Sequence, residues 1–481
     1  MFKNLLRFSF SYTIIEGLQK GIIFLLLPVI TSYLTTEEYG IVSTILIIIP
    51  ILSLIFSLVL NSSIARYYFK YEKNEEDLKD FIGTLFIFLS ILTVLFGGFT
   101  LLLAKPIFIF IFPGIKYDPY IIYSIIISVF QPIVFSYFSL LKVMQKLKEY
   151  IIIYNIYFIM QIGLMLLSII KFGMKHDGYL LSLVVSNILT FIITIILLIK
   201  QMNFVLKKDI IKEALTYSFP IIAVDGLSLL NSLVDRFYIM KFISIASVGI
   251  YYIGVQIGSI IALIALAINS AYVPIFFKNY ESDDNNYDEI YRMGDLIVYF
   301  AGIVGSILVI ISPYFFDVFF KESYKGAKTI IIYLCFLSVM KSIYFLNTNI
   351  LSLEVKLVKM KTKAILIGAT VNIIIGYFLT MHYKMIGAAI STLLGFSITT
   401  VLLIYLVRTK TDFKFNYKKQ LSFVLSLFLV SFLLIHFELN SIISSIILKF
   451  ILLIIALIVI ISTIEYKFFK SKIYATFNIQ K

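Results

Sequence analysis

Long apolar segments recur along the whole 481-residue chain, and they constrain its fold more than any other feature. A helix needs about 20 mainly apolar residues to cross a bilayer. Hydrophobic residues make up 60% of the sequence and charged residues 14%, whereas a soluble domain carries roughly 25% charged residues. The sequence therefore predicts an all-α polytopic membrane protein with about 14 transmembrane helices, at 8–33, 41–61, 81–104, 118–141, 150–171, 179–199, 217–240, 249–276, 294–316, 329–350, 364–382, 385–406, 420–437 and 442–465.

Lysine and arginine are concentrated in every second loop between these spans. RYYFKYEKNEEDLKD, KVMQKLKEY and EVKLVKMKTK are basic, whereas TTEEYG, HYK and FELN are short and poor in basic residues. Basic loops stay in the cytoplasm, so both termini are expected there, which agrees with an even number of spans. We expect a multi-pass protein of the bacterial cytoplasmic membrane. The formal charge of +14 then reflects topology, and no nucleic-acid partner is expected.

The chain contains an internal repeat with a shift of 209 residues. SFSYTIIEGL from Ser9 matches SFPIIAVDGL from Ser218, and the same shift matches Gly40 with Gly249. An even number of spans separates matched positions, so the two halves run parallel and are related by an axis along the membrane normal. We expect two parallel six-helix lobes plus two extra helices: an amino-terminal lobe at 1–199, a linker at 200–216, a carboxy-terminal lobe at 217–406, and the last two spans with a tail at 407–481.

Two formal charges stand inside the first span. Glu16 and Lys20 are four residues apart, on one helical face that also carries Gln19. A charged residue at a helix centre costs about 2.5–3.5 kcal/mol on insertion scales. A pair at this spacing recovers only about 0.2–0.5 kcal/mol. These side chains therefore need further partners or water.

The repeat-related span 217–240 is also polar along one stripe. Its Asp225 matches Glu16 in the repeat, whereas Leu229 stands where the first span has Lys20. We expect both stripes to face a shared internal cavity. The stripe and further polar groups assigned to this cavity are Ser232, Asp235, Arg236, Asn61, Arg66, Gln256, Asn269 and Lys341.

A structural interpretation of these charges stays open. Glu16 with Lys20, and Asp235 with Arg236, are also suited to be buried ion pairs that hold the bundle together. Arg66 lies beside a loop and fits equally a topology signal or a snorkelling residue.

Motifs for catalysis are absent from the sequence. There is no GxxxxGK[ST] phosphate loop, and none of the three histidines has a helical partner spaced for a metal. The single Cys335 lies in an apolar run. We expect no catalytic residues, no metal site and no organic cofactor, and a conduit instead of an enzyme.

Three segments carry a resemblance to a known family. LTTEEYGIVS, NSSIARYYFKYE and NSLVDRFYIMKFISIASVGIYY resemble the polysaccharide-biosynthesis, O-antigen-type flippases of the multidrug/oligosaccharidyl-lipid/polysaccharide exporter superfamily. The resemblance implies a fold like that of the multidrug and toxin extruders. It also implies movement of undecaprenyl-diphosphate-linked oligosaccharides to the outer leaflet by alternating access, for surface polysaccharides such as lipopolysaccharide. The implied partners are that substrate, membrane lipids, and polysaccharide polymerase or assembly proteins.

The resemblance also implies roles for the charges within the spans. The cations Lys20, Arg66, Arg236 and Lys341 would hold the diphosphate or acidic sugars. Glu16, Asp225 and Asp235 would balance them between cycles or bind a coupling proton or sodium ion, and Gln19, Asn61, Ser232, Gln256 and Asn269 would complete a polar cavity. Three alternatives stay open: a cation-coupled multidrug exporter, a flippase for a lipid-linked peptidoglycan precursor, and, more remotely, a membrane oligosaccharide polymerase.

Overall fold

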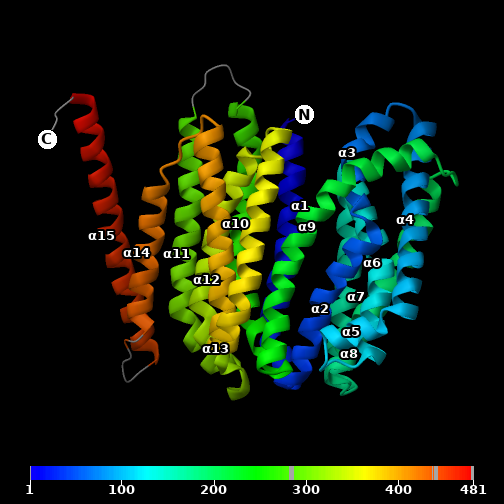
Figure 1. Cartoon of the computed structure of the whole chain (residues 1–481), viewed down its shortest axis with the longest axis horizontal. Helices are drawn as coiled ribbons and strands as arrows, with labels where there is room; N and C mark the ends of the chain where they lie inside the picture. The colour runs from blue at the N-terminus through cyan, green and yellow to red at the C-terminus, as the bar shows by residue number, and fades with distance from the viewer. Residues whose placement is uncertain (1, 281–286, 436, 438–441, 478–481) are drawn as a thin grey trace. The chain divides into compact units, whose positions relative to one another are not determined.

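The computed structural model describes residues 2–280, 287–435, 437 and 442–477, and it is helical throughout, with no strand in these ranges (Figure 1). The expected all-α class is therefore confirmed. The helices are α1 (Phe2–Tyr33), α2 (Thr36–Ser57), α3 (Leu60–Tyr71), α4 (Glu75–Leu103), α5 (Lys105–Ile111), α6 (Ile122–Val143), α7 (Leu147–Leu166), α8 (Lys175–Leu198), α9 (Lys208–Phe242), α10 (Ile245–Tyr280), α11 (Asp288–Phe319), α12 (Lys328–Ile350), α13 (Val355–Lys410), α14 (Tyr417–Ile435) and α15 (Ile442–Phe477).

Within the described ranges, thirteen helical segments are long and apolar enough to cross a membrane. They overlap all fourteen predicted spans, because α13 contains two of them, 364–382 and 385–406. Lys384 separates the two parts with a non-helical backbone (φ 55°, ψ −135°). Residues 281–286 and 438–441, which belong to loops used in the topology prediction, lie outside the described residues.

The second predicted span, 41–61, begins and ends earlier in the structure than expected, because α2 runs from Thr36 to Ser57. α2 ends at Ser57, and Leu58 and Val59 adopt left-handed backbone angles (φ 48° and 55°) before α3 begins. The Val59 amide donates to Ser57 Oγ at 3.2 Å, which supports this turn. Bulky residues rarely adopt such angles. Because neither Leu58 nor Val59 is a glycine or a proline, the sequence gives no sign of the break. Asn61 and Arg66 consequently belong to a separate helix, α3, and not to the end of α2.

The chain divides into two compact units. The first unit comprises Leu18–Tyr252 and Asn372–Ala388, and the second comprises Met1–Gly17, Ile253–Val371 and Ala389–Lys481. This grouping counts α9 with the first unit, whereas the repeat assigns it to the carboxy-terminal lobe. The lobe boundaries themselves stay a prediction.

Helix α6 lies at the centre of the first unit. It contacts α2, α4 and α8, while α7 packs on α8 and α9 packs on α2 and α3 (Figure 1). Ile125, Tyr137 and Leu140 of α6 are completely buried. A helix that is apolar on several faces is buried in this way among its neighbours.

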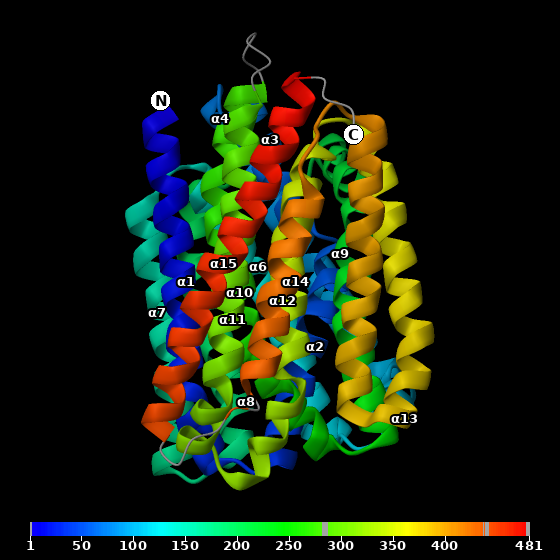
Figure 2. The ribbon, with the colours of Figure 1, turned by 90° about the vertical axis from the view of Figure 1, so that its left-hand side faces the viewer.

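In the second unit, α11 makes the most extensive contacts with other helices. It packs against α12 and α14, and α14 in turn packs against α15, so the last two helices of the chain join this unit through α11 (Figure 2).

Two repeat-related glycines meet where α2 and α10 begin, within the first unit. A Cβ atom on Gly249 would lie 2.8 Å from the amide nitrogen of Gly40, and one on Gly40 would lie 2.8 Å from Cγ2 of Ile245 and closer still to its carbonyl oxygen. No side chain fits between these backbones. The pair that the repeat matches in sequence therefore forms a direct contact.

We predict that Gly40→Ala lowers the stability of the protein by about 1–3 kcal/mol, because the added methyl overpacks this contact. Gly98→Ala in α4 is the matched control, since its Cβ would meet nothing within 4 Å. Thermal unfolding in detergent measures both. Equal unfolding midpoints for the two variants would contradict the close approach.

Candidate functional site

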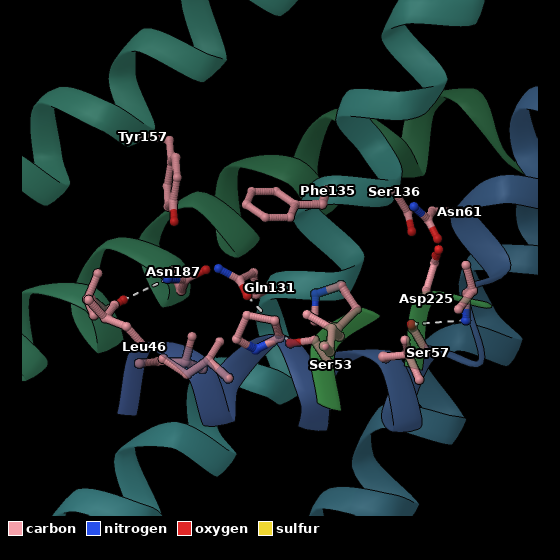
Figure 3. Close-up of a pocket in the computed structure, with 18 of the residues that line it drawn as sticks. Leu46, Ser53, Ser57, Asn61, Gln131, Phe135, Ser136, Tyr157, Asn187 and Asp225 are labelled. Atoms are coloured by element: carbon pink, nitrogen blue, oxygen red, sulfur yellow. Dashed lines mark hydrogen bonds between the residues drawn. The ribbon is translucent and has the colours of Figure 1, made fainter. Parts of the chain in front are cut away.

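A cavity of about 530 Å³ lies inside the first unit (Figure 3). Its walls come from α2, the start of α3, α6, α7, α8 and α9. The polar lining residues are Ser53, Ser57, Asn61, Gln131, Ser136, Tyr157, Gln161, Asn187, Asp225 and Ser228. Five of the six elements are membrane-length helices, so the cavity places hydrogen-bonding groups within the membrane-spanning region.

Two prolines stand in the cavity wall, Pro50 inside α2 and Pro132 inside α6. A proline within a helix removes a backbone hydrogen bond and bends the helix locally. Next to them, Ser53 Oγ lies 3.5 Å from Gln131 Oε1 across the gap between the two helices. The prolines thus mark where α2 and α6 leave room for the cavity.

Tyr157, Gln131 and Asn187 lie close together at one end of the cavity (Figure 3). Asn187 Nδ2 donates to the Leu183 carbonyl at 2.8 Å, which fixes the amide. Its Oδ1 atom is buried and has no hydrogen-bond partner in the described structure. A buried acceptor without a partner costs free energy, so this oxygen favours a molecule that can donate to it.

Asp225, Asn61 and Ser136 gather at the other end (Figure 3). The Asp225 side chain is exposed to the cavity. Ser136 Oγ is buried and, within the described structure, has no hydrogen-bond partner. Asp225 is the single carboxylate among the cavity's lining residues, all of which are described, and none of them is Lys, Arg or His. The cavity is therefore suited to an uncharged polar molecule or a cation.

Two of the residues predicted from the sequence, Asp225 and Asn61, line this cavity together. The other predicted residues of the first unit do not. Gln19 is buried and its Nε2 donates to Asn155 Oδ1 at 3.1 Å. Lys20 on α1 and Arg66 on α3 are exposed.

Asp235 and Arg236 are packed in the interior of the first unit and are not part of the cavity lining. Tyr251 donates its hydroxyl to Asp235 Oδ2 at 3.2 Å. Arg236 Nη1 donates to the carbonyl of Ser232 at 2.8 Å, and its guanidinium lies over the ring of Tyr252 at 5.0 Å. Ser232 itself is exposed. The structure does not bring Arg236 to the cavity that contains Asp225.

The remaining predicted residues are grouped with the second unit. Asn269 is buried and accepts a hydrogen bond from Asn349 Nδ2 at 2.8 Å. Lys341 on α12, Gln256 on α10 and Glu16 on α1 are half-buried. Their assignment to a substrate or coupling site stays a prediction.

Most polar residues of the cavity wall are absent from the set predicted from the sequence. Gln131, Tyr157, Gln161 and Asn187 are uncharged and stand within strongly apolar segments. An amide in hydrocarbon is costly unless it is hydrogen-bonded. A search for every amide inside a predicted span would have found three of these four residues.

A set of buried hydrogen bonds holds α9 against α3 beside the cavity. The hydroxyls of Ser63 and Ser218 lie 2.8 Å apart, Ser63 Oγ donates to the Ala214 carbonyl at 3.0 Å, and Ser218 Oγ donates to the Val59 carbonyl at 3.1 Å.

A surface ion pair extends this α3–α9 contact. Lys70 Nζ lies 2.7 Å from the Glu213 carboxylate, and this hydrogen bond raises the pKa of Lys70. Because Lys70 is largely exposed, the pair contributes little to stability. The contact therefore depends mainly on the buried serines, and it keeps the helix with Asp225 beside the helix with Asn61.

We predict that Ser218→Ala destabilises the protein by about 1–3 kcal/mol, because it removes the buried hydrogen bonds of Ser218 to Ser63 and to the Val59 carbonyl, each worth about 0.5–1.5 kcal/mol. Thr216→Ala on the same helix is the control, since Thr216 is exposed and bonds only to its own helix, at the Lys212 carbonyl. Chemical unfolding followed by circular dichroism measures the difference. A loss in Thr216→Ala as large as that in Ser218→Ala would contradict the anchoring role.

Comparison with solved structures shows what fold the chain has. The structure is similar to that of the lipid II flippase MurJ in an inward closed conformation, with a TM-score of 0.70, 17% sequence identity, and coverage of 97% of this chain and 98% of that chain. It is also similar to the Vibrio cholerae MATE transporter VcmN in the bent form, with a TM-score of 0.56, 13% identity, and coverage of 85% and 98%. The expected MATE-like fold is confirmed.

Comparison of sequences identifies the family. The chain is 23% identical over 335 residues to an uncharacterized membrane protein of Haemophilus influenzae (strain ATCC 51907 / DSM 11121 / KW20 / Rd), which covers 68% of this chain and 79% of the relative. Residues 5–280, more than half of the chain, match the family described as "Polysaccharide biosynthesis protein". The chain therefore belongs to the polysaccharide biosynthesis protein family, and it is a multi-pass membrane protein with the fold of the MurJ and MATE transporters.

Proposed function

We propose that the protein is a flippase that moves undecaprenyl-diphosphate-linked oligosaccharides from the inner to the outer leaflet of the bacterial cytoplasmic membrane. The observation that carries this proposal is a polar cavity among apolar, membrane-length helices in a chain of the polysaccharide biosynthesis family. Apolar spans alone need no such cavity. Hydrogen-bonding groups placed there serve a polar molecule that crosses the membrane.

The transport mechanism in this proposal is alternating access. The prolines at 50 and 132, in opposite walls of the cavity, give α2 and α6 points at which they can bend. Asp225, exposed to the cavity, is the carboxylate that would bind a coupling proton or sodium ion. Both termini lie in the cytoplasm in this proposal, and polysaccharide polymerase or assembly proteins are the partners.

The cations predicted from the sequence hold the charged part of the substrate in this mechanism. Lys20, Arg66 and Lys341 are the candidates with exposed or half-buried side chains, suited to a diphosphate. Arg236 is buried, with its guanidinium over the ring of Tyr252, so its contact with substrate would require α9 or α10 to move. Glu16 and Asp235 balance these charges between cycles.

We predict that deletion of the gene makes the cell accumulate lipid-linked oligosaccharide in the inner leaflet and lose surface polysaccharide. Extraction of the lipid-linked pool, followed by mass spectrometry and a leaflet-specific glycan label, measures this. Accumulation of unpolymerised units in the outer leaflet would instead indicate a polymerase, and would contradict flipping.

The same cavity supports a second candidate function, a cation-coupled multidrug exporter. Its single carboxylate, Asp225, and its aromatic residues Phe135 and Tyr157 are the chemistry that an organic cation favours. The deletion strain separates the two functions. Greater retention of ethidium with an unchanged lipid-linked pool would favour the exporter and contradict the flippase.

We predict that Lys20→Ala abolishes surface polysaccharide without lowering the amount of protein, because an exposed cation is lost from the predicted diphosphate site. Lys73→Ala is the control, since Lys73 is an exposed cation in the turn between α3 and α4. Glycan gels and immunoblots of complemented deletion strains measure both. Normal polysaccharide at the wild-type protein level would remove Lys20 from the site.

A further inference from the structure

We propose that the cavity of the first unit binds the hydroxyl groups of the sugars in the substrate, and not its diphosphate. This inference rests on the proposed flippase function and names which part of the substrate the cavity receives. The sugars would dock against α2, α6, α7, α8 and α9, while the anionic group would lie elsewhere.

The charge of the cavity lining disfavours a diphosphate. None of the twenty residues that line the cavity is Lys, Arg or His, and Asp225 contributes a carboxylate. A diphosphate placed there would meet a like charge without a counterion, in surroundings that water screens poorly. The lining therefore excludes the charged group of the substrate.

Two buried polar atoms of the lining without partners in the described ranges favour a ligand with hydroxyl groups. Asn187 Oδ1 and Ser136 Oγ, both on completely buried residues of the lining, have no hydrogen-bond partner in the described structure. They lie at opposite ends of the cavity, near Tyr157 and Asp225 respectively (Figure 3). A sugar presents several hydroxyls around one ring, each able to donate and to accept, so a single ligand can reach both ends.

An aromatic side chain in the cavity wall, Phe135, suits the apolar face of a sugar ring. Phe135 is 40% exposed and stands between the two polar ends in the view of Figure 3. A pyranose ring has an apolar face of C–H groups that packs on such a ring, while its hydroxyl edge points to the amides. The cavity volume of about 530 Å³ is in the range of small-molecule sites, about 300–1,000 Å³.

An organic cation fits the same cavity less well. Asp225 would attract it, and Phe135 would stack on it. A quaternary cation has no N–H or O–H group, so the oxygen of Asn187 would stay unsatisfied. Nine of the ten polar lining residues are uncharged, which favours a ligand that is recognised through hydrogen bonds.

A tryptophan reporter tests the proposal directly, because the natural chain contains no tryptophan. Phe135→Trp places the single indole in the cavity wall and keeps an aromatic ring there. The full-length variant in nanodiscs is titrated with three probes. They are the oligosaccharide released by mild acid and phosphatase from the lipid-linked pool of the deletion strain, inorganic diphosphate, and tetraphenylphosphonium.

The expected result is a saturable change in Trp fluorescence with the phosphate-free oligosaccharide and none with diphosphate at the same concentrations. In the same background, Asn187→Leu should weaken oligosaccharide binding about 10-fold, since it removes the unpartnered acceptor. Thr190→Val on α8 is the control, because Thr190 is buried but bonds to the Ser186 carbonyl and does not line the cavity. Thermal unfolding shows whether Asn187→Leu is folded, and Ser136→Ala provides the second test if it is not.

The other outcomes overturn the proposal in distinguishable ways. A response to diphosphate, or to tetraphenylphosphonium but not to the oligosaccharide, shows that the cavity binds charge and not sugar. A response to the intact lipid-linked oligosaccharide without any response to the released sugar contradicts the assignment and leaves the flippase function standing. A deletion strain without a lipid-linked pool overturns the flippase function, and this inference with it.

Discussion

A polar group inside a bilayer must find a partner or water, and the rest of this structure depends on that requirement. It makes every described segment of any length helical, because a helix satisfies its own backbone. It also explains why polar side chains within the spans form the contacts that they do. Gln19 pairs with Asn155, Asp235 with Tyr251, and Arg236 with a backbone carbonyl and an aromatic ring. In the cavity, the buried atoms Asn187 Oδ1 and Ser136 Oγ have no hydrogen-bond partner in the described structure.

The break between α2 and α3 decides what the cavity can contain. Leu58 and Val59 turn the chain so that Asn61 begins a new helix at the cavity wall. The buried Ser63–Ser218 contact then holds α9 against α3, which keeps Asp225 beside Asn61. A short helix and two hydroxyls thus assemble residues that are more than 160 positions apart in the sequence.

Much of the fold could be predicted from the sequence because hydrophobic length is a local property. Each of the fourteen predicted spans overlaps a described helix, and Gly40 and Gly249, which the repeat aligns in the sequence, are in contact in the structure. The candidate site could be predicted only in part. Asp225 was predicted from its repeat match to Glu16 and Asn61 from its place at the end of a span, whereas no such feature distinguishes Gln131 and Asn187 in their apolar segments. The predicted end of the second span, at residue 61, was wrong because Leu58 and Val59, two bulky residues with positive φ, leave no signal in the sequence.

The sequence by itself determined the class of the protein, its spans, its internal repeat and its family resemblance, since each depends on residue type and spacing along one chain. Only the tertiary structure decided which polar groups share a cavity. It separated Arg236 from Asp225 although both stand on α9, and it joined Asp225 to amides of α3, α6 and α8. The physical reason is that a helical face specifies a direction, whereas the partner in that direction depends on how distant helices pack.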